Sequence, residues 1–176
     1  MIVTSRLRLR PLRADDAEPT VALMSEAISR WTGSWTPAPT PSDVLGRIER
    51  HQAAETESRA IMRAIEGASD GRLMGWIGVD RLADDPRRGS LGYWLGEAFW
   101  GRGHAGEAAA AMVRDAWGRL DLDVIEAGAQ PENAASIAIL RRLGMAEIGP
   151  RSHFAPARGR DEVCLYFEIR RPSAST

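Results

Sequence analysis

Three apolar segments between residues 60 and 95 are joined by short turns, and this spacing constrains the fold more than any other feature. The segments read AIMRAI, RLMGWIGV and SLGYWL, and the turns between them read GASDG and ADDPRRG. A short turn joins strands that run in opposite directions, because parallel neighbours need a long crossover. The sequence therefore predicts an antiparallel meander.

Further strands and helices are predicted on both sides of the meander. RLRLR near the N-terminus reads as a strand, a capping box over residues 15–18 starts a helix, and Thr40, Pro41 and Asp43 start another. After the meander come a helix, the strand DVIEAGA, a helix over residues 133–143, and the strands MAEIG and EVCLYFEI. We expect one α/β domain with a mixed sheet over residues 1–171 and a frayed tail at residues 172–176.

Composition excludes several classes of protein. All 23 basic residues are arginine, which excludes a Walker A loop and a pyridoxal-phosphate Schiff base, because both need lysine. The formal net charge is -1 with both signs mixed along the chain, which argues against nucleic-acid binding. No segment resembles a membrane span or a signal peptide, and lone Cys164 cannot form an internal disulfide. We therefore expect a cytoplasmic protein.

The stretch FWGRGHAGEA contains Gly101, Gly103 and Gly106 in the spacing G-x-G-x-x-G, directly before an amphipathic helix. A helix N-terminus offers unpaired N–H groups and the positive end of the helix dipole, and glycine lets an anion approach the backbone closely. Arg102 adds a cation that suits phosphate. The stretch predicts a phosphate-binding loop, with a plain glycine-rich turn as the alternative.

A dinucleotide-binding fingerprint is a second alternative, because Glu126 follows Gly106 by 20 residues, where a ribose-binding acid is expected. That fingerprint belongs on the first strand-helix turn of a largely parallel sheet, however, and here a meander precedes the glycines. The order of elements therefore disfavours a nicotinamide dehydrogenase. Glu126 is interpreted as a charge at the end of a strand.

A second constellation lies in AQPENAASIAILRRLGMAEIG. Asn133 is placed to cap the helix over residues 133–143, and Gly144 is placed to end it. Ser136 shares a helix face with Ile139 and Leu140, which directs its hydroxyl inward. The alternative is that this hydroxyl only bonds to the preceding turn.

The two constellations together resemble the GNAT superfamily of acyl-CoA N-acyltransferases, and within it the branch of ribosomal-protein N-terminal acetyltransferases such as RimJ and RimL. The family's loop pattern Q/R-x-x-G-x-G/A is matched by Gly103 and Ala105, with Trp100 in the first position. The resemblance covers nearly the whole chain. It implies a mixed, mostly antiparallel sheet of about seven strands flanked by about four helices, splayed between the fourth and fifth strands.

The resemblance also implies acetyl-CoA as co-substrate, without a metal. Residues that bind coenzyme A in the family correspond to three groups here: the strand residues Tyr93, Trp94 and Leu95, the loop residues Trp100, Gly101, Arg102, Gly103, His104, Ala105 and Gly106, and the helix residues Asn133 and Ser136. Asn133 resembles the residue that bonds the pantetheine amides. Ser136 resembles the hydroxyl that protonates the departing thiolate. The reaction implied is direct attack of an amine on acetyl-CoA in a ternary complex.

The general base is not evident from the sequence. Many relatives have glutamate two residues before the glycine of the Gly-Tyr-Trp segment, and this chain has Ser90 there. The remaining candidates are Asp80, Glu97, His153 and Asp161. The departure at Ser90 keeps open a second function, that of a non-catalytic acyl-CoA-binding or sensor protein.

The acceptor is expected between the loops at residues 31–40 and 152–160, with Trp31, Trp35 and Phe154 as substrate-binding residues. The alternative for both tryptophans is that their rings close over the core. A small-molecule amine and a protein N-terminus both remain open as acceptors. A monomer and a homodimer both remain open as assemblies.

Overall fold

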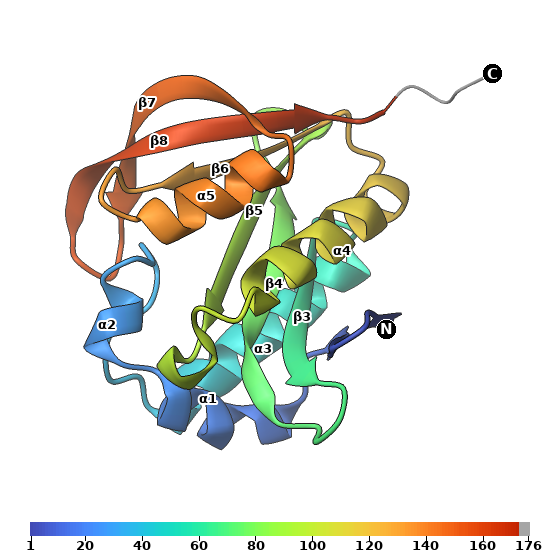
Figure 1. Ribbon diagram of the computed structural model, residues 1–176. Helices are drawn as coiled ribbons and strands as arrows, with labels where there is room; N and C mark the ends of the chain where they lie inside the picture. The colour runs from blue at the N-terminus through green and yellow to red at the C-terminus, as the bar shows by residue number, and fades with distance from the viewer. Residues whose placement is uncertain (173–176) are drawn as a thin grey trace.

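The computed structural model describes residues 1–172, so residues 173–176 of the expected tail lie outside the described residues (Figure 1). The described residues form one eight-stranded sheet in the order β1-β2-β3-β4-β5-β6-β8-β7. The strands are β1 (Ile2–Val3), β2 (Leu7–Pro11), β3 (Ala60–Gly67), β4 (Leu73–Arg81), β5 (Arg88–Leu95), β6 (Val124–Ala129), β7 (Ala146–Ala155) and β8 (Arg160–Arg170). All neighbouring strands are antiparallel except β5 and β6. The predicted meander and mostly antiparallel mixed sheet are confirmed.

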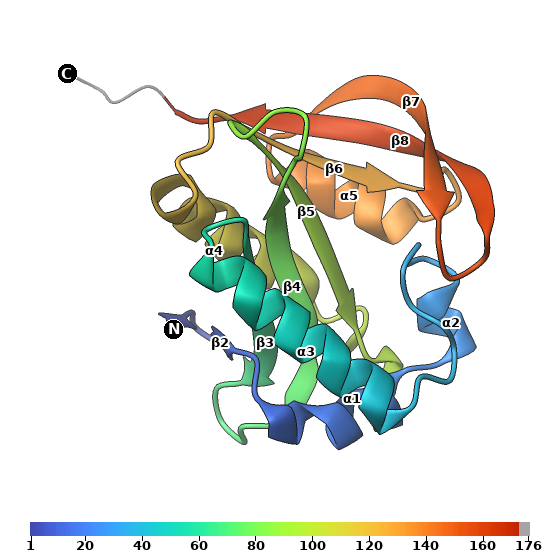
Figure 2. The same ribbon diagram turned by 180° about the vertical axis from the view of Figure 1, so that it is seen from behind.

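Helices cover both faces of the sheet. They are α1 (Ala17–Leu23), α2 (Glu26–Ser29), α3 (Pro41–Thr56), α4 (His104–Arg119) and α5 (Ala134–Arg142), with 3-10 turns at Ala14–Asp16 and Glu97–Phe99. Figure 1 shows α4 and α5 in front of the sheet, and Figure 2 shows α1 and α3 on the other face. The strand and helix counts exceed the expected seven and four because the two-residue β1 and the four-residue α2 are too short to leave a periodic signal.

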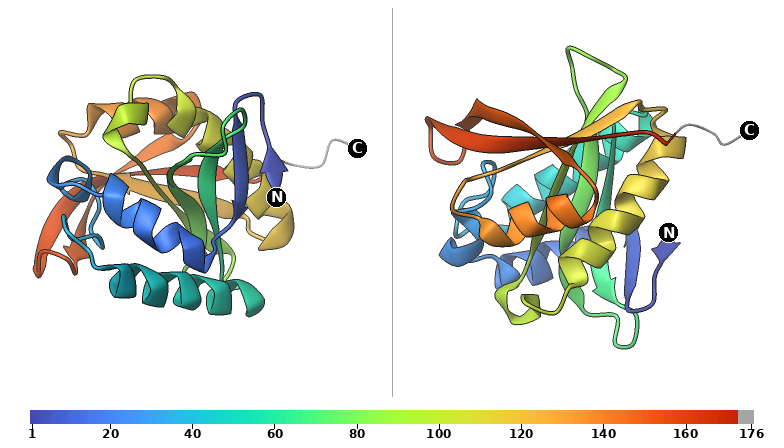
Figure 3. Two further views of the ribbon diagram at one scale, coloured as in Figure 1. Left: turned by 90° about the horizontal axis from the view of Figure 1, so that it is seen from below. Right: turned by 45° about the horizontal axis from the view of Figure 1, so that its top comes forward.

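Each helical layer has its own hydrophobic core. The buried face of α4, including Met112, Ala116 and Trp117, packs with β2, β4 and β5 in the larger core. The smaller core joins Val44 and Ile48 of α3 to Trp76 and Trp94 of the sheet. Figure 3 shows the two layers on opposite sides of the sheet. The sheet therefore separates two helical layers that meet only around its edges and its gap.

That gap is the expected splay between the fourth and fifth predicted strands, β5 and β6. Their parallel pairing is limited to Arg88–Ser90 against Val124–Glu126, after which the two strands diverge. The β7-β8 hairpin continues the sheet beyond β6 and turns back towards α2 (Figures 1 and 2). The splay opens a passage through the sheet between the two helical layers.

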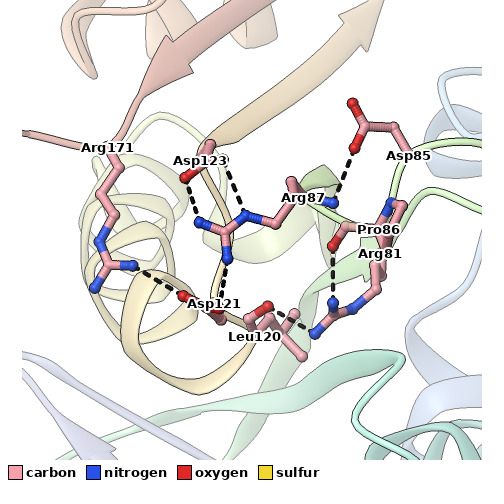
Figure 4. A network of polar contacts seen from close by, with 8 residues as sticks. All are labelled: Arg81, Asp85, Pro86, Arg87, Leu120, Asp121, Asp123 and Arg171. Carbon is pink, nitrogen blue, oxygen red and sulfur yellow. Dashed lines mark hydrogen bonds and ion pairs between the residues drawn. The ribbon is translucent and has the colours of Figure 1, made fainter.

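A polar network fixes the closed end of the β5-β6 pair (Figure 4). Arg87 donates hydrogen bonds to both carboxylate oxygens of Asp123, at 2.9 and 2.6 Å, and pairs with Asp121. The backbone N–H of Asp123 returns a bond to the Arg87 carbonyl at 2.8 Å. Arg81 bridges the Pro86 and Leu120 carbonyls, at 2.8 and 2.7 Å. The two strands therefore start in fixed register before they separate.

The predicted starts of the two N-terminal helices have different outcomes. Thr40 caps α3, with Pro41 in the first turn and Asp43 completing a capping box, as predicted. The capping box over residues 15–18 is wrong by two positions, because the observed box runs from Arg13 to Asp16, whose carboxylate accepts the Arg13 N–H at 2.7 Å. Asp16 is also buried against Arg10. That tertiary pair leaves no trace in local sequence.

The expected loop at residues 152–160 is also wrong in extent. Residues 152–155 continue β7, Arg160 begins β8, and only residues 156–159 form the turn. The strands extend because β7 and β8 stay paired up to Ala155 and Arg160. The far wall of the expected acceptor site is therefore a rigid hairpin end.

Candidate active site

The cavity between β5, α4 and α5, here called the α4–α5 cavity, has a volume of about 440 Å³. It brings together almost all of the residues expected to bind coenzyme A. Those that line it are Tyr93, Trp94, Leu95, Trp100, Gly101, Gly103, His104, Ala105, Gly106, Asn133 and Ser136. Arg102 is exposed and does not line the cavity, whereas its carbonyl accepts a bond from Arg6 at 2.8 Å. Arg142 of α5 lines the cavity instead.

The loop before α4 is held in a backbone shape that needs glycine. Gly101 has φ +71° and Gly103, the N-cap residue, has φ +77°, a region that side-chain-bearing residues rarely adopt. The first N–H group that bonds into the helix is that of Glu107, to the Gly103 carbonyl at 3.1 Å. The N–H groups of His104, Ala105 and Gly106 come before it in the chain. At a helix start there is no earlier turn whose carbonyls could accept their hydrogen bonds. The loop therefore offers a set of backbone donors at the cavity wall.

Two side chains, those of Trp100 and Glu107, anchor this loop. The Trp100 indole donates to the Leu95 carbonyl at 2.8 Å, which folds the loop back on the end of β5. Glu107 accepts bonds from Thr4 at 2.6 Å and from the Arg6 backbone and side chain at 3.0 and 2.7 Å. Burial opposes the charge of Glu107, but these hydrogen bonds outweigh it and lower its pKa to about 2. Glu107 is therefore a structural anion at the helix start.

Asn133, Ser136 and Tyr93 form a polar cluster at the inner end of the same cavity. The Asn133 side chain accepts the Ser136 N–H at 3.1 Å and caps α5 as predicted. The Tyr93 hydroxyl donates to the Ser136 hydroxyl at 3.4 Å, across the gap from β5 to α5. Burial raises the pKa of Tyr93. The family resemblance includes Tyr93 among the expected coenzyme-binding residues, but the sequence gives no sign of its contact with Ser136, which comes from a separate helix.

The second cavity, called the α3 cavity, lies on the opposite face of the splay and has a volume of about 500 Å³. Its walls come from α3, the segment of residues 31–35, the sheet, and the end of the β7-β8 hairpin. Trp31, Trp35 and Phe154 all line it. Trp35 is only 7% exposed and lies edge-on to Trp76 and Trp94, with ring centroids 5.2 and 5.4 Å apart. Its ring therefore both closes over the core and forms the cavity wall.

The two cavities meet at the splay. Trp31, Thr32, Tyr93 and Trp94 line both of them. On the α3 side the floor at the gap includes Gly92 of β5, where an added Cβ would enter open space. A group held in one cavity can therefore approach a group held in the other through the gap in the sheet.

The hairpin end is tied to the segment before α3. Arg158 donates to the Ser29 and Thr32 carbonyls, at 2.8 and 3.1 Å, and forms a two-point pair with Glu162 at 2.7 and 2.6 Å. Bonds from Arg158, together with those from Arg160 and Gln130, hold the pKa of Glu162 at about 2 despite the opposing effect of burial. Glu162 lines the α3 cavity, and its carboxylate is already paired with Arg158.

The four base candidates are placed differently. Asp80 and His153 line the α3 cavity, whereas Glu97 and Asp161 do not, and Glu97 accepts a bond from Ser25 at 2.5 Å. Asp80 of β4 is the direct cross-strand partner of Ser90. Apart from its backbone pairing in the sheet, no hydrogen bond or ion pair from another described residue reaches the Asp80 carboxylate. Burial by the surrounding protein raises the pKa of Asp80, although its carboxylate stays open to the cavity.

The interpretation of Glu126 as a charge at a strand end is wrong. Glu126 lies in the middle of β6 and is only 5% exposed. It pairs with Arg88 at 2.9 Å and with Arg151 at 3.2 Å. Its local sequence does not indicate burial, because the compensating arginines come from two other strands. Glu126 belongs to the interior of the sheet.

Comparison with known proteins identifies the family. The family described as "Acetyltransferase (GNAT) domain" matches residues 6–146. The chain belongs to the GNAT acetyltransferase family. A curated relative, the uncharacterised N-acetyltransferase p20 of Bacillus licheniformis, is 28% identical over 174 residues, which cover 98% of each chain.

Solved structures agree with this assignment. An acetyltransferase from Agrobacterium tumefaciens has a TM-score of 0.76 at 28% identity, covering 97% of this chain and 94% of that chain. RimJ of Mycobacterium smegmatis, in complex with CoA-disulfide, has a TM-score of 0.81 at 22% identity, covering 94% and 86%. The expected similarity to the RimJ and RimL branch is therefore confirmed at the level of the GNAT fold.

The α4–α5 cavity fits the coenzyme that GNAT acetyltransferases use. Its loop presents backbone donors at the positive end of α4, two glycines keep the approach to them free of side chains, and Arg142 adds a cation.

No helix of the described residues is long and apolar enough to cross a membrane. Within residues 1–172, no group of three His, Cys, Asp or Glu side chains is arranged to hold a metal ion.

Proposed function

We propose that the protein transfers the acetyl group of acetyl-CoA to a primary amine in a ternary complex. The observation that carries this proposal is the meeting of two cavities at the β5-β6 splay, one bounded by a phosphate-binding helix start and the other by aromatic side chains and a carboxylate. The branch that the chain resembles acts on protein N-termini, so an N-terminal amine and a small-molecule amine are the two acceptor types.

The α4–α5 cavity holds the coenzyme. The N–H groups at residues 101–106 bind the pyrophosphate, Tyr93, Trp94 and Leu95 border the pantetheine arm, and Asn133 faces its amides. Acetyl-CoA supplies the activated acetyl group. Catalysis by this chain then comes mainly from positioning both reactants at the gap.

Protons move at both sides of the gap. The amine nitrogen bonds to the acetyl carbon as the carbon-sulfur bond breaks, and Asp80 accepts the proton that the amine loses. The raised pKa of Asp80 favours this role, since it makes the carboxylate a stronger base. Ser136 donates a proton to the departing thiolate and takes one from Tyr93, whose hydroxyl donates to it. Solvent then returns a proton to Tyr93 and takes the one held by Asp80 when the products leave. Asp80 thus takes the place of the glutamate that many relatives have at the Ser90 position.

A non-catalytic acyl-CoA sensor is the second candidate function, and Ser90 is the residue that favours it. Two measurements separate the candidates. Acetyl-CoA at 100 times its Kd stabilises a protein that binds it only when folded by about 2.7 kcal/mol, and NAD is expected to have no effect. Thiol release from acetyl-CoA is then followed across amines and N-terminal peptides.

The outcomes are distinct. Stabilisation with thiol release and acetylated product supports the transferase. Stabilisation without turnover across the panel supports the sensor. No stabilisation by acetyl-CoA contradicts both.

A further inference from the structure

The α3 cavity contains one unpaired side-chain charge of each sign among the residues that the structure describes. Two arginines line it, and Arg158 is paired with Glu162 at 2.6 Å, whereas Arg47 forms no ion pair. Two carboxylates line it, and Asp80 is the one without an arginine partner. Arg47 is partly buried, so its charge gains from a ligand of opposite sign, whereas Asp80 is exposed to the cavity. Among its described lining residues, the cavity therefore presents one free cation and one free anion to a ligand.

Arg47 is held rigidly enough to bind a ligand. Its guanidinium lies over the Trp35 ring, 4.3 Å from the centroid, and donates to the Ser34 carbonyl at 2.7 Å. Burial, and then the nearby charge of Arg50, lowers the pKa of Arg47, yet arginine stays protonated throughout the physiological range. A planar guanidinium stacked on an indole presents its remaining donors in a fixed direction, which suits a carboxylate or a phosphate.

Among the described groups near Arg47, Asp43 attracts it without forming an ion pair, and none adds a second unpaired cation to the α3 cavity. His51, one helical turn later in α3, has its pKa lowered to about 4 by burial and by the charges of Arg47 and Arg50, so it is neutral at pH 7. Asp43, one turn earlier, is bonded to Thr40 at the helix start. Arg50 does not line the α3 cavity. Arg47 is therefore the cation of this wall.

The two unpaired charges lie at opposite ends of an aromatic surface. Arg47 stacks on Trp35, and Trp35 contacts Trp76 edge-on at 5.2 Å. Trp76 and Asp80 lie on the same face of β4, four residues apart, which corresponds to about 13 Å along a strand. Asp80 stands beside Ser90, where β5 and β6 begin to separate. The length of β4 between Trp76 and Asp80 sets the scale of this separation, on the order of 10 Å.

We propose that the acceptor is an amine that carries a carboxylate or phosphate group on the order of 10 Å from its nitrogen. The amine enters at Asp80 and the splay, an apolar or aromatic spacer lies along Trp35 and Trp76, and the anionic group binds Arg47. This inference rests on the proposed function and specifies its substrate class. Long-chain ω-amino acids and short peptides with an acidic residue near the N-terminus share this chemistry.

Matched pairs of amines test the proposal. The acceptors are 8-aminooctanoate against octylamine and 4-aminobutanoate against butylamine, each assayed for acetylated product with saturating acetyl-CoA. A bound charge-assisted pair predicts that kcat/KM for 8-aminooctanoate exceeds that for octylamine by about 10- to 100-fold. The ratio is smaller for the short pair, because its carboxylate cannot reach Arg47 while the amine is at the gap. The C-terminally amidated peptides Ser-Ala-Glu and Ser-Ala-Gln, in which only the Glu side chain carries a carboxylate, apply the same comparison to N-termini.

Variants then assign the effect to one residue. Arg47→Gln lowers the long-pair ratio to about 1, Arg47→Lys retains part of it, and the matched control Arg50→Gln leaves it unchanged, since Arg50 carries the same charge on the same helix outside the cavity. Thermal melting of each variant shows that it is folded.

The proposal is overturned if the wild-type protein has an equal or higher kcat/KM for the alkylamines than for the amino acids. It is also overturned if the ratio of kcat/KM for 8-aminooctanoate to that for octylamine is unchanged in Arg47→Gln. If no amine is acetylated, the proposed function fails together with it. Acetylation of alkylamines without preference for the anionic probes overturns only the substrate class.

Discussion

The two cavities that meet at the splay are built from different parts of the chain. The α4–α5 cavity depends on backbone: an α4 start capped by Gly103, the N–H groups that precede Glu107, and the free edge of β5. The α3 cavity depends on side chains from segments spread over most of the chain, including Arg47, Asp80 and Phe154. The difference suggests that the first surface recognises a common ligand, whereas the second sets which amine is accepted.

The largest expected effect concerns the proposed base. Asp80→Asn is expected to lower kcat by about 100- to 10,000-fold, because a positioned general base contributes this much. In the wild type, kcat/KM falls as the pH drops through the raised pKa of Asp80, since protonated Asp80 cannot accept a proton. Asp80→Asn removes that limb of the pH profile.

A relocated carboxylate makes this test specific. Ser90 is the cross-strand partner of Asp80, so Ser90→Glu in the Asp80→Asn background puts a carboxylate within about 5 Å of the lost one and is expected to restore part of kcat. Glu97→Gln serves as the control, because Glu97 lines neither cavity. An Asp80→Asn enzyme with nearly wild-type kcat would show that the α3 cavity binds the acceptor amine but takes no part in proton transfer.

The next effect lies in the α4–α5 cavity and tests its one catalytic side-chain pair. Ser136→Ala and Tyr93→Phe are each expected to lower kcat by about tenfold, less than most acid catalysis supplies, because a thiol with pKa near 8.5 is a good leaving group. The double variant is expected to be little worse than either single one, since both act through one contact of 3.4 Å. Fully additive losses would mean that the two hydroxyls act independently.

A smaller effect tests whether backbone shape makes the phosphate site. Gly103→Val forces a β-branched residue to φ +77°, at a strain of about 1–3 kcal/mol, and is expected to weaken acetyl-CoA binding about tenfold. Gly118→Ala in the same helix is the control, because its Cβ meets open space and alanine favours the helix. Titration calorimetry measures both. If Gly103→Val binds acetyl-CoA as tightly as the wild type, side chains such as Arg142, and not the loop backbone, recognise the phosphate.

The contrast between the cavities also explains what the sequence could predict. The glycine loop and the Asn133 cap are local patterns, and the family resemblance added the strand residues, so most residues that line the α4–α5 cavity could be named from the sequence. Arg47, Cys164 and Tyr166 line the α3 cavity through tertiary packing, and no short spacing joins them. Arg102 illustrates the limit within the first cavity, because its position in the loop was predictable and the direction of its side chain was not.

The smallest expected effect is on stability and concerns the frame of the backbone-built cavity. Glu107 anchors the α4 start to residues 4–6, and Glu107→Gln is expected to lower the free energy of unfolding by about 1–2 kcal/mol at pH 7. The folded-state pKa of Glu107 is lowered to about 2 from an ordinary value of 4.5, so its contribution is present above pH 4.5 and is lost as the pH falls through 2. Urea unfolding of the variant and the wild type is expected to give free energies of unfolding that converge as the pH falls over that range. The control Glu132→Gln, at an exposed site, is expected to leave both the free energy of unfolding and its pH dependence unchanged. A difference that persists at pH 2 would show that Glu107 acts through packing, and that this cavity too relies on side-chain shape.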